Sequence, residues 1–181
     1  MRVLLFCFAL CSVLLISSHI AMARPAPCKV AQLIAEEDRN DADEIDGGAG
    51  HHAMTIAIRN RSSEECLLEG VPTLILSGKA SRPFTVRLCS ICSDYLFDMQ
   101  PVDKIMLKPN TSAWVVLGYE INDGGGTCRD AATVSLRLQN EVAALRIDMV
   151  RHGGAMRSCG KIDVTPFLSK PPVDGFLPQL H

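Results

Sequence analysis

The sequence predicts an all-β protein, an antiparallel β-sandwich cross-linked by disulfides. Hydrophobic and polar residues alternate along several short segments, turn-forming residues separate these segments, and none carries a sustained helical stripe. Eight cysteines in 181 residues exceed ordinary cytosolic usage. The length fits one domain, and 48% hydrophobic with 21% charged residues is typical of globular chains. A net charge of −2 lacks the basic excess of a nucleic-acid-binding protein.

The first 23 residues have the features of a secretory signal peptide. Arg2 supplies a positive charge, residues 3–16 form an apolar run, and Ala21-Met22-Ala23 has the small-x-small pattern that signal peptidase recognises. The run is shorter than the roughly 20 residues that span a bilayer, so we expect no stable membrane span after cleavage. A retained N-terminal anchor is the alternative. The mature chain would be secreted or periplasmic.

Cleavage leaves six cysteines, an even number that favours three disulfides in an exported chain. They are Cys28, Cys66, Cys89, Cys92, Cys128 and Cys159. Six cysteines allow many pairings, and the spacing alone does not choose among them.

The mature chain begins with a predicted strand near residues 28–35, followed by an acidic loop over about residues 36–46 and the glycine-rich turn 47–50. A calcium-binding loop is the alternative, because hard cations bind clustered carboxylate oxygens. The spacing of the acids does not match the helix–loop–helix calcium pattern, so we favour a solvated loop.

Two-residue periodicity predicts seven to nine short strands in the rest of the chain. Alternation is clearest over residues 54–59, 84–88, 134–138 and 145–149. Further strands are expected at residues 72–77, 103–107, 112–121 and 161–165. Each alternating segment exposes one face and buries the other, as antiparallel sheets do. Short strands with this spacing favour a β-sandwich.

Residues 24–167 form the predicted sandwich domain, and residues 168–181 a proline-rich tail. Prolines recur from Pro166 onward, and proline cannot donate a ladder hydrogen bond. We expect this stretch to extend from the body, with Phe176 and Leu177 as candidates to dock it. Trp114 alternates with Val115 in a predicted strand, which favours a place on a sandwich face over a binding role.

Several motifs follow one another in a distinctive order. They are Gly48-Ala49-Gly50-His51, Asn60-x-Ser62, Cys66-x-Leu68-x-Gly70-x-Pro72, Leu107-x-Pro109-x-x-x-Ala113, and Cys128 and Cys159 ahead of Val164-x-Pro166. In these motifs the sequence resembles a family of exported bacterial domains called domain of unknown function 4232. The resemblance covers roughly residues 28–167. Its motif residues of interest are Gly50, His51, Asn60, Gly70 and Pro72.

The resemblance implies an immunoglobulin-like sandwich, export, and the disulfides Cys28–Cys66 and Cys128–Cys159. It implies no established activity. The chain departs from the family pattern at Val71, where an aromatic residue is frequent, and at Asn110, where glycine is usual. Gly70 and Pro72 have the chemistry of a turn, since glycine gives backbone freedom and proline a fixed φ. Asn60 and Asn110 each begin a glycosylation pattern, which matters only in a host with that machinery.

The segment Cys89-Ser90-Ile91-Cys92 is a third departure, an addition to the family pattern. If the implied pairs form, Cys89 remains to pair with Cys92 in a structural loop disulfide. The alternative is thiol–disulfide exchange, which needs a lowered thiol pKa. Acidic residues follow Cys92, and nearby acids raise a thiol pKa. Zinc would need a second pair of ligands.

Histidines and methionines form another candidate set, because copper selects imidazole and thioether ligands in an oxidising compartment. His51, His52 and Met54 lie at one strand entry, and His152 with Met156 lies in a glycine-rich turn. The simpler interpretation, which we favour, is core methionines and exposed loop histidines. We therefore assign no metal and no cofactor. His51 is a candidate to hydrogen-bond its turn, because the resembling family carries histidine there.

The sequence contains no nucleophile-elbow, zinc-protease or phosphate-loop motif, and no acid pair stands out for acid–base catalysis. We therefore predict an exported, non-enzymatic module that binds or scaffolds an unknown protein or envelope ligand, without nucleic acid. The alternative is an exported thiol-redox or copper-binding protein that uses Cys89 and Cys92 or the histidines and methionines.

Overall fold

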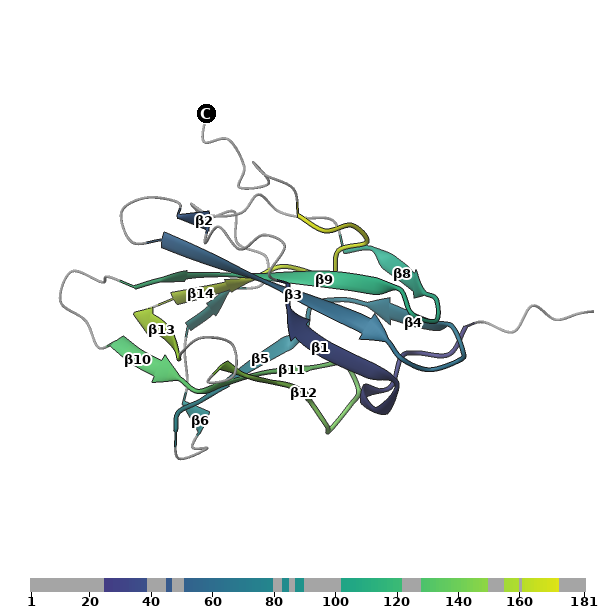
Figure 1. Ribbon diagram of the computed structural model, residues 1–181, viewed down its shortest axis with the longest axis horizontal. Coiled ribbons are helices and arrows are strands. Elements are labelled where there is room, and N and C mark those ends of the chain that lie inside the picture. The colour runs from purple at the N-terminus through teal and green to yellow at the C-terminus, as the bar shows by residue number, and fades with distance from the viewer. Residues whose placement is uncertain are drawn as a thin grey trace, which may run out of the picture.

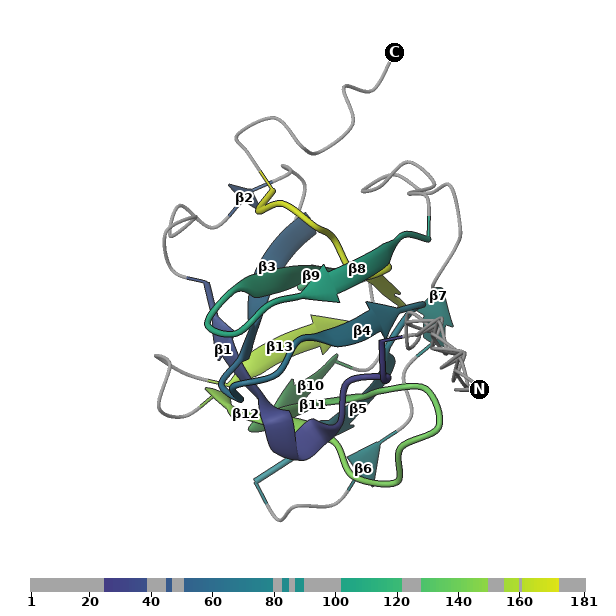
Figure 2. The same cartoon turned by 90° about the vertical axis from the view of Figure 1, so that its right-hand side faces the viewer.

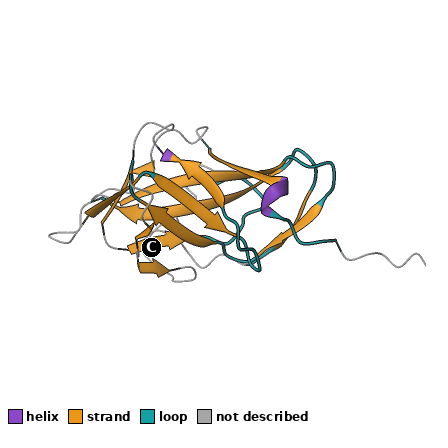
Figure 3. Cartoon of the chain, turned by 90° about the horizontal axis from the view of Figure 1, so that it is seen from below, coloured by secondary structure: helices purple, strands orange, loops and turns teal. Residues whose placement is uncertain are grey.

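The computed structural model describes residues 25–38, 45–46, 51–79, 83–84, 87–89, 102–121, 128–149, 155–159 and 161–172. Strands make up nearly all of the regular structure in these ranges, and helix is confined to short turns such as η1 (Val30–Gln32) (Figure 3). The predicted all-β fold class is confirmed. Within the same ranges, no helix is long and apolar enough to cross a membrane.

Two sheets form the layers of the sandwich (Figure 1). The first has the order β1–β3–β9–β14–β7, with β2 also paired to β3: β1 (Leu33–Glu37), β2 (Ile45–Asp46), β3 (His51–Asn60), β7 (Arg87–Cys89), β9 (Ser112–Glu120) and β14 (Lys161–Val164). The second has the order β12–β11–β5–β6: β5 (Thr73–Ser77), β6 (Pro83–Phe84), β11 (Thr133–Arg137) and β12 (Leu145–Asp148). An end-on view shows one layer above the other (Figure 2).

Two small sheets complete the described strands: β4 (Cys66–Glu69) with β8 (Lys104–Leu107), and β10 (Cys128–Ala131) with β13 (Met156–Cys159). The pairings between the named strands are antiparallel except that β14 and β7 run parallel, and the isolated bridge between Pro27 and Leu67 is also parallel. The β14–β7 exception to the antiparallel prediction arises where the chain crosses from β6, in the second sheet, to β7, in the first.

The strand predictions differ from the structure mainly in the shortest elements. The single strand expected over residues 84–88 is two strands, β6 and β7, in different sheets. Strands β4, β10 and β13 were not predicted, because their residues, Cys-Leu-Leu-Glu, Cys-Arg-Asp-Ala and Met-Arg-Ser-Cys, do not alternate between hydrophobic and polar. The strand predicted near residues 28–35 is instead the short helical turn η1 followed by β1, and β2 lies where a loop was expected. The other predicted strands are confirmed to within a few residues.

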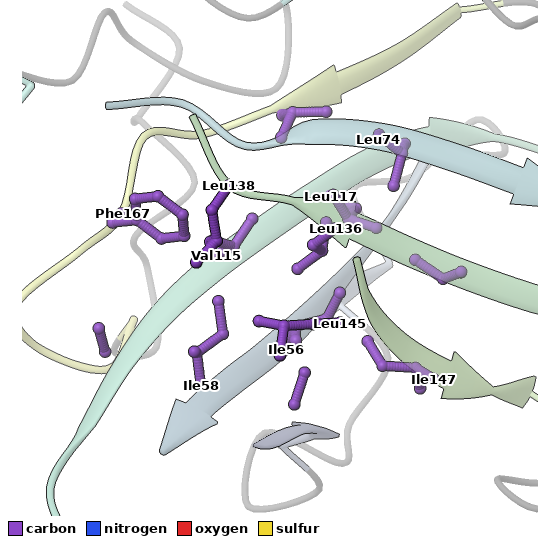
Figure 4. Packing of buried hydrophobic residues seen from close by; sticks show 14 of the residues in the cluster. Ile56, Ile58, Leu74, Val115, Leu117, Leu136, Leu138, Leu145, Ile147 and Phe167 are labelled. Atoms are coloured by element: carbon purple, nitrogen blue, oxygen red, sulfur yellow. The ribbon is translucent and has the colours of Figure 1, made fainter. Parts of the chain in front are cut away.

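The core lies between the two sheets (Figure 4). Ile56 and Ile58 of β3 and Val115 and Leu117 of β9 point inward from the first sheet. Leu74, Leu136, Leu145 and Ile147 meet them from the second sheet. Burial of such side chains stabilises the fold by roughly 25 cal/mol for each Å² of apolar surface removed from water.

The start of the expected tail belongs to the fold. Thr165–Leu168, here called the C-terminal strap, continues from β14 along the same side of β9: the Thr165 N–H donates to the Val116 carbonyl at 3.1 Å, and the Leu168 N–H to the Trp114 carbonyl at 2.8 Å. Between these pairs Phe167 turns into the core, where it is 1% exposed. Pro166 cannot donate a hydrogen bond, and pairing resumes two residues later. Phe176 and Leu177 lie outside the described residues.

The acidic run begins inside a strand rather than in a loop. Glu36 and Glu37 belong to β1 and lie opposite Ala57 and Ile56 of β3. The Asp38 N–H continues this edge by donating to the Thr55 carbonyl at 2.9 Å. The chain returns to the same edge as β2, whose Ile45 lies opposite Ala53. Main-chain pairing along β3 therefore extends the first sheet into the acidic run, while the Glu36 side chain stays exposed.

Candidate functional site

The long strands β3 and β9 run antiparallel and define two ends of the sandwich. At one end β3 begins with His51 opposite Glu120 of β9, and we call this the His52 end. At the other end β3 finishes with Asn60, and we call this the Asn60 end. Ile121, the residue after β9, brings β10 and β13 to the His52 end, because its carbonyl oxygen lies 2.9 Å from Cys159 Sγ.

His52 and Tyr119 form a stacked pair at the His52 end. They are direct cross-strand partners, with ring centroids 5.9 Å apart and an interplanar angle of 23°. His52 is only 8% exposed, so the expectation of an exposed loop histidine is wrong here. Two-residue alternation along β3 places His52 on the inner face with Met54. Tyr119 is half-buried and packs against the main core.

The other histidine and methionine candidates do not gather at an accessible place in the described structure. Met54 and Met156 are both buried in the core cluster, as expected for core methionines. The side chain of His51, and all of Gly50 and His152, lie outside the described residues. Within the described part of the chain, no group of three or more histidine, cysteine, aspartate or glutamate residues is arranged to hold a metal ion.

The two disulfides implied by the family resemblance are present, one at each end. Cys128 and Cys159 lie directly opposite each other in the β10–β13 pair and cross-link the His52 end. Cys28 and Cys66 join the start of the described chain to β4 at the Asn60 end. Cys89 is the last residue of β7, opposite Asp163 of β14. The Cys89 side chain and Cys92 lie outside the described residues.

The Asn60 side chain joins several backbone segments at the Asn60 end through hydrogen bonds. Its Nδ2 donates to the Glu64 carbonyl at 2.7 Å and to the Leu107 carbonyl at 3.0 Å. Its Oδ1 accepts from the Ser62 N–H at 2.9 Å and from the Ser62 hydroxyl at 2.8 Å. The side chain is fully buried, so Nδ2 is inaccessible to a glycosylating enzyme. The asparagine-x-serine spacing indicates such a turn as readily as a glycosylation site.

Two left-handed backbone positions adjoin this network. Gly70 has φ +91°, and a Cβ there would lie 2.9 Å from Gln139 Nε2. Its carbonyl accepts from the Phe167 N–H at 3.1 Å, which places the C-terminal strap against the turn. Asn110 has φ +60°, a conformation that asparagine tolerates, which explains how it replaces the usual glycine. Pro72 is buried behind the turn.

Trp114 lies on the outer face of β9, away from the core, as alternation predicts. Its Nε1 donates to Asp38 Oδ2 at 2.9 Å, across β3. No local sequence pattern indicates this contact, because the partners are 76 residues apart. Tyr119 was likewise missed as a site residue, since alternation alone makes it one more strand residue.

Residues 28–168 match the family model described as Domain of unknown function (DUF4232). No curated protein and no solved structure matches the chain.

Proposed function

Because the chain belongs to the family described as Domain of unknown function (DUF4232), whose description names no activity, we propose from the structure that it is an exported, non-enzymatic binding module. The ligand, an unknown protein or envelope component, contacts the His52 end. One observation carries this proposal: a half-buried tyrosine is held in place by a buried histidine at an end of the sandwich.

The geometry of the pair suits recognition. Tyrosine offers a large ring and a polar hydroxyl at a low cost in conformational entropy, and it is enriched at interfaces for that reason. Stacking on His52 restricts the ring further, so less freedom remains to be lost on binding. The Cys128–Cys159 bridge constrains the neighbouring β10–β13 pair in the same way. Sandwich proteins commonly bind through residues at one end of the strands.

Export is part of the proposal. Two disulfides are consistent with an oxidising compartment, either outside the cell or in a periplasm. The predicted signal peptide lies outside the described residues. Mass spectrometry of the mature chain is expected to show Arg24 as the first residue, and an intact N-terminus on the exported chain would contradict cleavage.

Site-specific photo-crosslinking tests the binding role. A photoreactive phenylalanine analogue at position 119 is expected to yield a covalent adduct in the native host. The matched control is the same analogue at Val142, an apolar position that is 96% exposed and belongs to the turn before β12. Adducts at position 142 with none at position 119 would contradict a ligand at the His52 end.

The thiol-redox and copper alternatives have separate tests. The burial of Met54 and Met156 supports binding over copper, because a metal needs ligands that converge on an accessible point. Copper titration of the mature protein is expected to show no site tighter than about micromolar. Peptide mapping is expected to find Cys89 bridged to Cys92 and resistant to mild reductant. A bridge that opens readily, together with disulfide exchange on a substrate, would favour the redox alternative.

A further inference from the structure

Strand β8 lies at the outer edge of its small sheet at the Asn60 end (Figure 2). Its neighbour β4 is paired on both sides, with β8 on one side and with residues 26–28 on the other. Among the described strands, β8 pairs with β4 alone. An edge strand of this kind is a template for backbone pairing with another chain.

The hydrogen bonds of Leu67 determine which backbone groups β8 presents. The Cys28 N–H donates to the Leu67 carbonyl at 2.9 Å, and the Leu67 N–H donates to the Ala26 carbonyl at 2.8 Å. Both polar groups of Leu67 therefore point away from β8. Leu67 lies opposite Met106, so this is a non-hydrogen-bonded pair, and the N–H and C=O of Met106 point to the open edge. The same alternation applies two residues earlier, at Lys104.

The side chains of β8 add a charge pattern to this edge. Ile105 and Leu107 are buried, whereas Lys104, Met106 and Lys108 are exposed. Met106 is 39% exposed and shares an apolar row with Leu67. Lys104 Nζ lies 3.4 Å from a Glu69 carboxylate oxygen, but both side chains are largely solvated, at 63% and 42% exposure. Such a surface ion pair is weak and leaves Lys104 able to meet a second carboxylate.

The lysines also select the partner. Two copies of β8 pairing antiparallel about Met106 would place Lys104 opposite Lys108, and like charges directly opposite destabilise a strand pair. Lysines on an edge likewise discourage indiscriminate pairing. A strand with an apolar residue at its centre and an acidic residue two positions to each side matches both the charges and the apolar row.

We propose that the open edge of β8 binds an extended segment of a partner protein by backbone pairing at Lys104 and Met106. The segment has an acidic–x–apolar–x–acidic pattern, in which the carboxylates meet Lys104 and Lys108. This interface lies at the opposite end of the sandwich from His52 and does not rest on the proposed ligand there.

The test titrates the ¹⁵N-labelled mature protein with a short peptide that has leucine at its centre and glutamate two residues to each side. Binding is expected to slow hydrogen exchange of the Met106 and Lys104 amides about tenfold or more. The same peptide with lysine in place of the glutamates is expected to have no effect. If the glutamate peptide at saturating concentration leaves both amides unchanged, the proposal is overturned.

Reversing the charges of the two lysines is a more specific test of the proposal. In the variant Lys104→Glu/Lys108→Glu, the Kd for the glutamate peptide is expected to rise about tenfold or more. The same variant is expected to bind the lysine peptide, which the wild type does not. The matched control is Lys79→Glu/Arg137→Glu, which makes the same charge change at two exposed positions away from β8 and should keep the wild-type preference. If both double variants lose affinity for the glutamate peptide equally, the effect comes from net charge alone, and the assignment of the peptide to the β8 edge is overturned.

A proline substitution and a measurement of oligomeric state complete the test. Met106→Pro removes the N–H that points to the open edge and leaves the β4 pairing intact, so it is expected to abolish peptide binding while the spectrum elsewhere stays folded. Sedimentation of the unliganded protein is expected to show a monomer. A concentration-dependent dimer in which the Met106 amide becomes protected would instead assign the edge to a second copy and overturn the acidic-partner proposal.

Discussion

The two ends of the sandwich are stabilised in different ways. At the Asn60 end a disulfide, a fully buried asparagine and the inserted Phe167 join β4, the β8–β9 turn and the C-terminal strap. At the His52 end the second disulfide joins only β10 and β13, and a histidine–tyrosine stack lies at the margin of the core. The comparison suggests that one end carries much of the stability, so that the other is able to present polar and aromatic groups.

The largest expected effect tests the Asn60 end. Phe167→Ala removes an entirely buried aromatic side chain and should lower the free energy of unfolding by about 4–5 kcal/mol, measured by urea denaturation. Leu168→Ala is the matched control, because Leu168 is only half-buried on the outer face and should cost about 1 kcal/mol. Similar losses in the two variants would show that the strap is not anchored through Phe167.

The disulfides compare the ends directly. The bridges span sequence separations of 38 and 31 residues, so the chain-entropy model predicts a similar loss of about 4 kcal/mol for either one. Local opening should differ. Hydrogen exchange is expected to accelerate in β4 and residues 26–28 in Cys28→Ala/Cys66→Ala, and in β10 and β13 in Cys128→Ala/Cys159→Ala. If hydrogen exchange accelerates at both ends in either variant, the two disulfides do not stabilise their ends independently.

Asn60→Ala should cost about 2–3 kcal/mol, because it leaves the buried Leu107 carbonyl without one of its donors and removes the turn contacts of Ser62. Ser62→Ala is the control, since it deletes the hydroxyl contacts to Asn60 Oδ1 and to the Glu64 backbone, keeps the Ser62 N–H bond to Asn60 Oδ1, and should cost less than half as much. Thermal unfolding measures both. A loss in Asn60→Ala no greater than that in Ser62→Ala would mean that the network does not fasten this end.

The smallest effect is expected at the His52 end. Tyr119→Leu keeps an apolar side chain against the core and loses the stack on His52, so stability should fall by less than about 1.5 kcal/mol. Binding at this end should be lost nevertheless. A loss of stability above about 3 kcal/mol would show that Tyr119 serves mainly to stabilise the core. The two ends would then contribute to stability in a similar way.

Local pattern was sufficient for much of the fold. Alternation located β3, β11 and β12 because their hydrophobic and polar residues follow one another with the two-residue period. The same reasoning placed Met54 inside and Trp114 outside. It failed where hydrophobic and polar residues do not alternate, in β4, β10 and β13. It also failed at the start of the predicted tail, where proline content concealed the pairing of Leu168 with Trp114.

The candidate sites were harder to predict. His52 was recognised as a strand-entry histidine, but its burial depends on Tyr119, a residue 67 positions along the chain that lies opposite it only in the β3–β9 register. The open edge of β8 depends on Leu67, whose hydrogen bonds go to residues 26–28. Neither partner is a neighbour in sequence, so no local pattern carries the information.

The amino-acid sequence by itself determined the all-β class, the alternating faces of the longer strands and, through its motif order, the family and its two disulfides. These features depend on local periodicity and on residues in a recognisable order. Only the tertiary structure decided that Asn60 and Phe167 fasten one end, that His52 is buried against Tyr119, and that Met106 presents its backbone outward. Each of these depends on which strand lies beside which, and that is set by long-range hydrogen bonding and packing.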